Sequence, residues 1–151
     1  MDCLDWAQSY YLITSYSWFN MAQIILIEPD KVLADIYRQG LQAENHQVVI
    51  CASAQAAIFA ADEIRPAIII MEMQLIGHSG IEFLYEFRSY TEWQAIPVLI
   101  HSQVPPSEFQ DAWSLLKDEL GIEGYLYKPT TNFATLARSV RVVLDAIPSS
   151  V

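Results

Sequence analysis

The chain has few basic residues and no cluster of them. Eight lysines and arginines stand against 18 aspartates and glutamates, which gives a formal net charge of −10 and a pI near 4.5. Binding to nucleic acid or to anionic lipid relies on clustered Lys and Arg, so the sequence argues against both. The two cysteines, Cys3 and Cys51, are too few for a disulfide framework and fit a reducing, cytoplasmic compartment.

Short catalytic motifs are also absent. The sequence has no G-x-S-x-G elbow and no glycine-rich loop of the kind that cradles phosphates. His78 and His101 do not have the spacing of a zinc site. We therefore expect no enzyme, no bound cofactor and no dedicated metal centre.

Residues 1–20 differ in composition from the rest of the chain. They lack a basic start and carry Asp2 and Asp5, so they make a poor signal peptide, and polar residues interrupt them too often for a membrane span. They contain six aromatic residues, from Trp6 to Phe19. Two interpretations stay open: a docking segment that covers an apolar patch, or an upstream extension before a domain that begins at Met21. We divide the chain into this extension, 1–20, and one domain, 21–151.

From residue 22 onward, apolar runs alternate with amphipathic stretches. Five runs, apolar on both faces, predict buried strands at 23–28, 46–51, 67–72, 96–102 and 124–128. Helical spacing of apolar residues, with N-caps at Asp30, Ser53 and Ser79, predicts helices at 30–43, 53–64, 79–90, 105–120 and 130–147. Strands that alternate with helices indicate a doubly wound α/β fold, in which helices cover both faces of a parallel sheet.

Four of the five predicted strands end on a polar residue. These residues are Glu28, Glu72, Ser102 and Lys128. The carboxyl ends of parallel strands meet at one edge of the sheet, so we expect the four side chains to face one another across a shallow pocket. A lysine there would offset the repulsion between the two carboxylates and keep both ionised.

The same strand ends carry a resemblance to a known family. The segments ILIEPD, IIIMEMQLIGHSG, IPVLIHSQ and GYLYKP occur in the order and spacing of a response-regulator receiver domain (CheY-like), over about residues 22–146. The resemblance implies a flavodoxin-like fold with five helices and a five-stranded parallel sheet in the order 2-1-3-4-5. It also implies a protein that accepts a phosphoryl group on an aspartate, next to Mg²⁺ held by an acidic pair.

Several residues match the positions that work in this family. Lys128, followed by Pro129, resembles the lysine that contacts the phosphoryl oxygen. Ser102 resembles the hydroxyl residue that swings toward the phosphate, and Tyr125 lies at the position of the aromatic switch residue. Glu28 matches the first member of the acidic pair.

Other positions depart from the family pattern. Glu72 replaces the phosphoacceptor aspartate, and Pro29 replaces the second acidic residue. Gln103 stands where a small residue often leaves the phosphate accessible. Glu72 adds one methylene to a site that requires accurate in-line attack, and Mg²⁺ loses an oxygen ligand at Pro29. The resemblance therefore predicts a pseudo-receiver with weak Mg²⁺ binding at best.

The role of Glu72 has three possible readings. It could form a structural ion pair with Lys128, it could mimic a phosphoryl group and lock one signalling state, or it could retain some phosphate or metal chemistry. Asp30 is a candidate replacement acid, but it fits better as the N-cap of the first helix. A working phosphoreceiver and a small-molecule-binding flavodoxin-like domain remain the alternatives to the pseudo-receiver.

We expect such a domain to act through protein partners or as a homodimer. Receivers commonly use the fourth helix, the fifth strand and the fifth helix for these contacts. In this chain the corresponding candidates are Phe109, Trp113, Leu116, Tyr127 and Arg138. Because no output domain follows the last predicted helix, we expect the output to pass through a separate chain.

Overall fold

A single parallel sheet organises the fold. A computed structural model describes residues 21–147, and the predicted extension, 1–20, lies outside the described residues. The five strands pair in the order β2-β1-β3-β4-β5, which confirms the predicted sheet. They are β1 (Gln23–Ile27), β2 (Gln47–Cys51), β3 (Ile68–Met71), β4 (Val98–Ser102) and β5 (Ile122–Tyr127).

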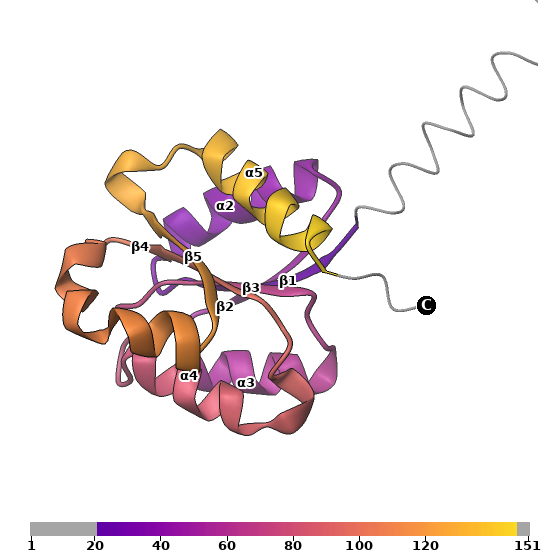
Figure 1. Cartoon of the computed structure of the whole chain (residues 1–151). Helices are drawn as coiled ribbons and strands as arrows, with labels where there is room; N and C mark the ends of the chain where they lie inside the picture. Colours follow the sequence, from indigo (N-terminus) through magenta and orange to yellow (C-terminus); the bar gives the residue numbers. More distant parts are fainter. Residues whose placement is uncertain (1–20, 148–151) are drawn as a thin grey trace, which may run out of the picture.

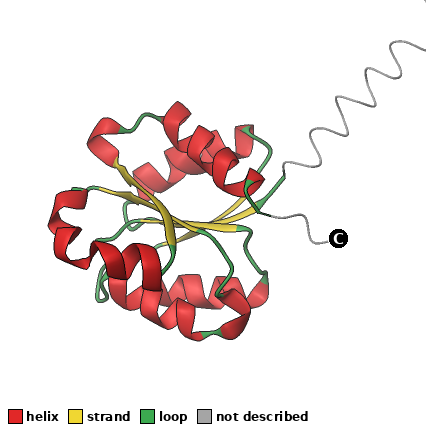
Figure 2. Cartoon of the chain, viewed as in Figure 1, coloured by secondary structure: helices red, strands yellow, loops and turns green. Residues whose placement is uncertain are grey.

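Helices cover both faces of this sheet. Helices α2 (Lys31–Ala43) and α5 (Phe133–Asp145) lie on one face, and α3 (Ala54–Glu63) and α4 (Gly80–Ser89) lie on the other (Figure 1). The strands in yellow lie between the two red helical layers in Figure 2. Alternate residues of β1 face opposite layers: Ile24 and Leu26 join the core beneath α2 and α5, whereas Ile25 and Ile27 join the core beneath α3 and α4. Both faces are buried, which explains why the strands are apolar throughout.

The helix starts follow the predicted caps. Asp30 accepts hydrogen bonds from the backbone N–H groups of Val32 (2.9 Å) and Leu33 (3.0 Å), so its carboxylate is used as the N-cap of α2. Ser79 forms the predicted capping box at the start of α4. The last helix begins at Phe133, later than predicted, because Lys128–Thr130 form a 3₁₀ turn before it.

The predicted helix at 105–120 is not one continuous helix. Residues Pro106–Ala112 form 3₁₀ turns with a non-helical backbone at Phe109, and Leu115–Glu119 form a π-helical turn. The N–H of Leu120 donates to the carbonyl of Leu115 at 2.8 Å. This wider turn brings Leu115 and Leu120, five residues apart, to the same core. No helix among the described residues is long and apolar enough to cross a membrane.

Candidate functional site

The four polar residues at the strand ends form one buried cluster. Glu28 directly follows β1, Glu72 follows β3, Ser102 ends β4 and Lys128 follows β5. Each is at most 9% exposed. The convergence that the sequence predicted is therefore present, and water is almost excluded from it.

Lys128 bridges the two carboxylates. Its Nζ donates to Oε2 of Glu28 at 2.6 Å and to Oε2 of Glu72 at 2.7 Å. All three side chains are 4% exposed. One buried cation thus serves two buried anions. If all three groups are ionised, the cluster has one negative charge in excess.

Glu72 receives more hydrogen bonds than its neighbours. Backbone N–H groups from the loops after β3 and β4 converge on its carboxylate together with two side chains. The five donors are Met73 N (2.8 Å) and Gln74 N (3.1 Å) to Oε1, Gln103 N (3.0 Å) and Lys128 Nζ (2.7 Å) to Oε2, and the Ser102 hydroxyl to Oε1. A carboxylate offers about four lone-pair directions, so Glu72 has none left for another ligand.

The pKa values of the two carboxyls move in opposite directions. Burial acts to raise the pKa of Glu72, but the hydrogen bonds from Lys128, Ser102 and the backbone outweigh it and lower the pKa below its ordinary value. Burial raises the pKa of Glu28, and its bond to Lys128 offsets this only in part. Burial acts to lower the pKa of Lys128, yet its two carboxylate partners raise it. The negative charge is therefore held most firmly on Glu72.

Ser102 connects this cluster to the loop that follows β4. Its hydroxyl donates to Glu72 and accepts a hydrogen bond from the N–H of Val104 at 3.0 Å. Val104 is held from its other side as well, because the hydroxyl of Tyr125 donates to its carbonyl at 2.6 Å. Burial raises the pKa of Tyr125, which keeps this hydroxyl protonated. Glu72, Ser102 and Tyr125 together hold the loop in one position.

The cluster lies beneath an open recess. Pro29 and Asp30 line a recess of about 360 Å³ over Glu28 and Glu72. Pro29 has no side-chain ligand, and the Asp30 carboxylate caps α2. Within residues 21–147, no three His, Cys, Asp or Glu side chains are arranged to hold a metal ion.

The two histidines near this edge do not act together. His101 is buried on β4 and packs edge-on against the ring of Tyr37, with centroids 4.8 Å apart. Burial and the nearby Lys128 lower its pKa to about 4, so it is neutral at pH 7. His78 is exposed in the loop before α4.

The predicted partner surface is only partly exposed. Trp113 is 38% exposed and Arg138 is exposed on α5, while Phe109 and Tyr127 are half-buried. Leu116 is fully buried in the core and cannot form part of a surface, so that prediction is wrong. The π-helical turn directs Leu116 inward.

This doubly wound fold carries acidic, hydroxyl and lysine side chains together at the carboxyl ends of its strands. Residues 24–141 match the family described as the response regulator receiver domain. The chain therefore belongs to the response regulator receiver family of two-component signalling.

The sequence identity to individual relatives is low. The chain is 28% identical over 109 residues to the KDP operon transcriptional regulatory protein KdpE of Escherichia coli, a match that covers 72% of this chain and 45% of KdpE. The chain thus spans less than half of that relative. The chemotaxis response regulator CheY4 of Vibrio cholerae has a similar structure, with a TM-score of 0.72 and 22% identity over 82% of this chain and 99% of CheY4. A signal receiver domain of a histidine kinase from Syntrophus aciditrophicus has a TM-score of 0.73, with 18% identity over 86% of this chain and 95% of that domain.

Sequence reasoning identified the side chains of the cluster but not its backbone donors. The N–H groups of Met73, Gln74 and Gln103 supply three of the five bonds to Glu72. Backbone donors carry no residue-type pattern, so only the loop conformation reveals them. Glycine marks that conformation: a Cβ at Gly80 would lie 2.8 Å from the Cα of Met73, and Gly77 has φ of +83°.

Proposed function

We propose that this chain is a pseudo-receiver, which binds protein partners without being phosphorylated. Glu72 replaces the phosphoacceptor aspartate and acts as a built-in charge. The observation that carries this proposal is the set of five donors on the Glu72 carboxylate, among them Lys128 and Ser102. These are the two side chains that would be expected to contact a phosphoryl group in a working receiver.

The hydrogen bonds on Glu72 oppose phosphoryl transfer. An attacking carboxylate needs a free lone pair directed at the phosphorus, and each oxygen of Glu72 is already engaged. Release of these bonds would leave the buried Glu72 carboxylate unpaired and Lys128 with Glu28 alone, which is costly. Pro29 also removes an oxygen ligand that Mg²⁺ would use to neutralise the transferring group.

The same bonds support a switch fixed in one state. The Glu72 carboxylate carries about one negative charge, against nearly two for a phosphoryl group, so it reproduces only part of that charge. It nevertheless engages Ser102, which bonds to Val104, whose carbonyl in turn accepts from Tyr125. The loop after β4 is held by Glu72 without any added group. A purely structural ion pair would not require Ser102 and Tyr125 to join the network.

The fixed loop lies beside the surface that we propose for partners. Phe109 and Trp113 both pack against the ring of Tyr125, with centroids 6.0 and 6.3 Å away. Trp113 remains exposed to solvent in spite of this contact. Arg138 on α5 is exposed as well. Aromatic residues and arginine often anchor protein interfaces. We therefore assign this face to a protein partner or to a second copy of the chain.

Phosphorylation with a small-molecule donor tests the proposal. The chain is incubated with Mg²⁺ and acetyl phosphate, and its intact mass is followed by mass spectrometry. We expect no phosphoryl adduct, whereas the double variant Pro29→Asp with Glu72→Asp, which restores the missing acids, should gain one. Stoichiometric phosphorylation of the natural chain would show that it is a working phosphoreceiver.

A further inference from the structure

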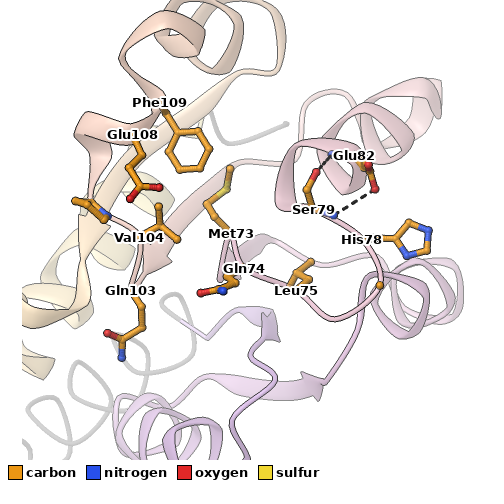
Figure 3. A pocket seen from close by; sticks show the side chains of 12 residues that line it. Met73, Gln74, Leu75, His78, Ser79, Glu82, Gln103, Val104, Glu108 and Phe109 are labelled. Carbon is orange, nitrogen blue, oxygen red and sulfur yellow. Dashed lines mark hydrogen bonds between the residues drawn. The ribbon is translucent and has the colours of Figure 1, made fainter.

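A second opening lies beside the closed carboxylate site. It is a cleft of about 670 Å³ between the loop before α4 and the segment after β4. Figure 3 shows Glu108 and Phe109 on one side, Ser79, Glu82 and His78 on the other, and Met73, Gln74 and Leu75 between them. Its volume is within the usual range for a binding site. Glu28, Glu72, Ser102 and Lys128 do not line it.

The charge of this cleft has one sign. Glu82 and Glu108 are exposed carboxylates on opposite walls, and no lysine or arginine lines the cleft. Neither carboxylate forms an ion pair within the described residues. The whole chain is also acidic, with a net charge of −10. A ligand for this cleft should be cationic.

The apolar lining limits what kind of cation fits. Met73, Leu75, Val104, Pro105 and Phe109 supply an apolar surface between the two carboxylates. No metal-binding group of three side chains is found within residues 21–147, so an organic cation suits the cleft better than a metal ion. A guanidinium on an aliphatic stem combines positive charge, apolar contact and the ability to stack on an aromatic ring such as that of Phe109.

The cleft is also held open in advance. Glu72 accepts hydrogen bonds from Met73 and Gln74 between the two walls and from Gln103 next to the Glu108 wall. The Ser102 and Tyr125 bonds to Val104 fix that wall further. A preformed cleft loses little conformational entropy when a ligand binds.

We propose that this cleft binds an arginine side chain from an apolar, basic segment of a partner protein. The inference rests on the proposed function, that the chain works by binding proteins. It adds the chemistry of the partner and a contact surface next to the exposed face around Trp113, with Phe109 common to both. Glu108 and Glu82 supply the charge, and Phe109 supplies the stacking surface.

An amide NMR titration tests this proposal. The probe is an acetylated and amidated peptide of glycine, leucine, arginine, leucine and glycine, at about 0.15 M salt, where charges beyond about 8 Å are screened. The matched probe has citrulline, which is neutral and of similar shape, in place of arginine. We expect saturable shifts at the amides of Gln74, His78, Val104 and Glu108 with the arginine peptide, and much smaller shifts with the citrulline peptide.

Charge-neutral variants locate the binding. Glu108→Gln and Glu82→Gln should each weaken the arginine peptide about two- to five-fold, as expected for exposed charges. Glutamine can still complete the capping box at Glu82, so the fold is kept. Asp111→Asn and Glu86→Gln are the controls: both residues are exposed on the same two elements but do not line the cleft. They should leave the affinity unchanged.

Three results would overturn the proposal. These are equal binding of the arginine and citrulline peptides, losses in the control variants as large as those in the cleft variants, and no saturable binding of the arginine peptide. The titration contains neither Mg²⁺ nor a phosphodonor. Its failure is therefore distinct from a failure of the proposed function, which would show as phosphorylation of Glu72 or another residue.

Discussion

Replacing Lys128 with methionine removes the cation that holds the two buried carboxylates. Methionine ends at Cε, one atom short of the ammonium, so the substitution leaves Glu28 and Glu72, each 4% exposed, without their common partner. Removal of one member of a buried ion pair typically costs about 3–5 kcal/mol. We expect the free energy of unfolding of Lys128→Met at pH 7 to be lower than that of the natural chain by this amount, measured by urea unfolding.

Glu28→Gln is the matched comparison. It leaves one lysine and one carboxylate in the cluster, so the excess negative charge disappears. Burial raises the pKa of Glu28, which means that its ionised form costs stability in the folded protein. The glutamine carbonyl can still accept from Lys128. We expect a change of less than about 1 kcal/mol, in contrast to the large loss for Lys128→Met.

The pH dependence of the Lys128→Met variant follows from the same charges. Without the lysine, we expect the folded-state pKa of both carboxyls to rise, because each stays buried but loses its bond to Lys128. A carboxyl with a raised folded pKa destabilises the fold at high pH, and this effect disappears as the pH falls and the group is protonated. The deficit relative to the natural chain should therefore be largest at pH 7 and shrink toward pH 4.5. A loss below about 1 kcal/mol at pH 7, or a loss independent of pH, would refute the reasoning.

Three further substitutions test other contacts. Tyr125→Phe removes the bond to Val104, so it should cost about 1 kcal/mol and speed amide exchange in the loop after β4, measured by hydrogen exchange. Gly80→Ala should lower the melting temperature, because its Cβ would lie 2.8 Å from the Cα of Met73; an unchanged melting temperature would contradict the close packing. The pKa of buried His101 is lowered to about 4, so its stabilising contribution is complete above its unfolded value near 6.5 and is lost as the pH falls toward 4. His101→Leu should make unfolding less sensitive to pH between 6.5 and 4, measured by denaturant titrations.

The sequence was sufficient for the fold and for the side chains of the site. Strands apolar on both faces predicted a covered parallel sheet, and polar residues at the strand ends predicted their convergence. Lys128 donates hydrogen bonds to both Glu28 and Glu72, in the cluster that the pattern indicated. The family resemblance then supplied the strand order and identified Glu72 and Pro29 as departures from the family pattern.

The sequence was insufficient where tertiary contacts override local preference. The segment 106–119 has the composition of a helix, but it forms 3₁₀ and π turns that bury Leu116 and Leu120. Local propensity cannot report which side of the chain the core lies on. The amide donors to Glu72 were also hidden, because any residue type can supply a backbone N–H.

A beryllofluoride titration addresses most directly whether the pocket has lost its phosphoryl chemistry. Beryllofluoride with Mg²⁺ mimics a phosphoryl group on a receiver aspartate, and amide NMR reports binding at individual residues. We expect no site-specific shifts in the natural chain, and saturable shifts around Ser102 and Lys128 in the Pro29→Asp with Glu72→Asp variant. Saturable shifts at the same residues in the natural chain would contradict the pseudo-receiver and would make this an unusual but working phosphorylation switch.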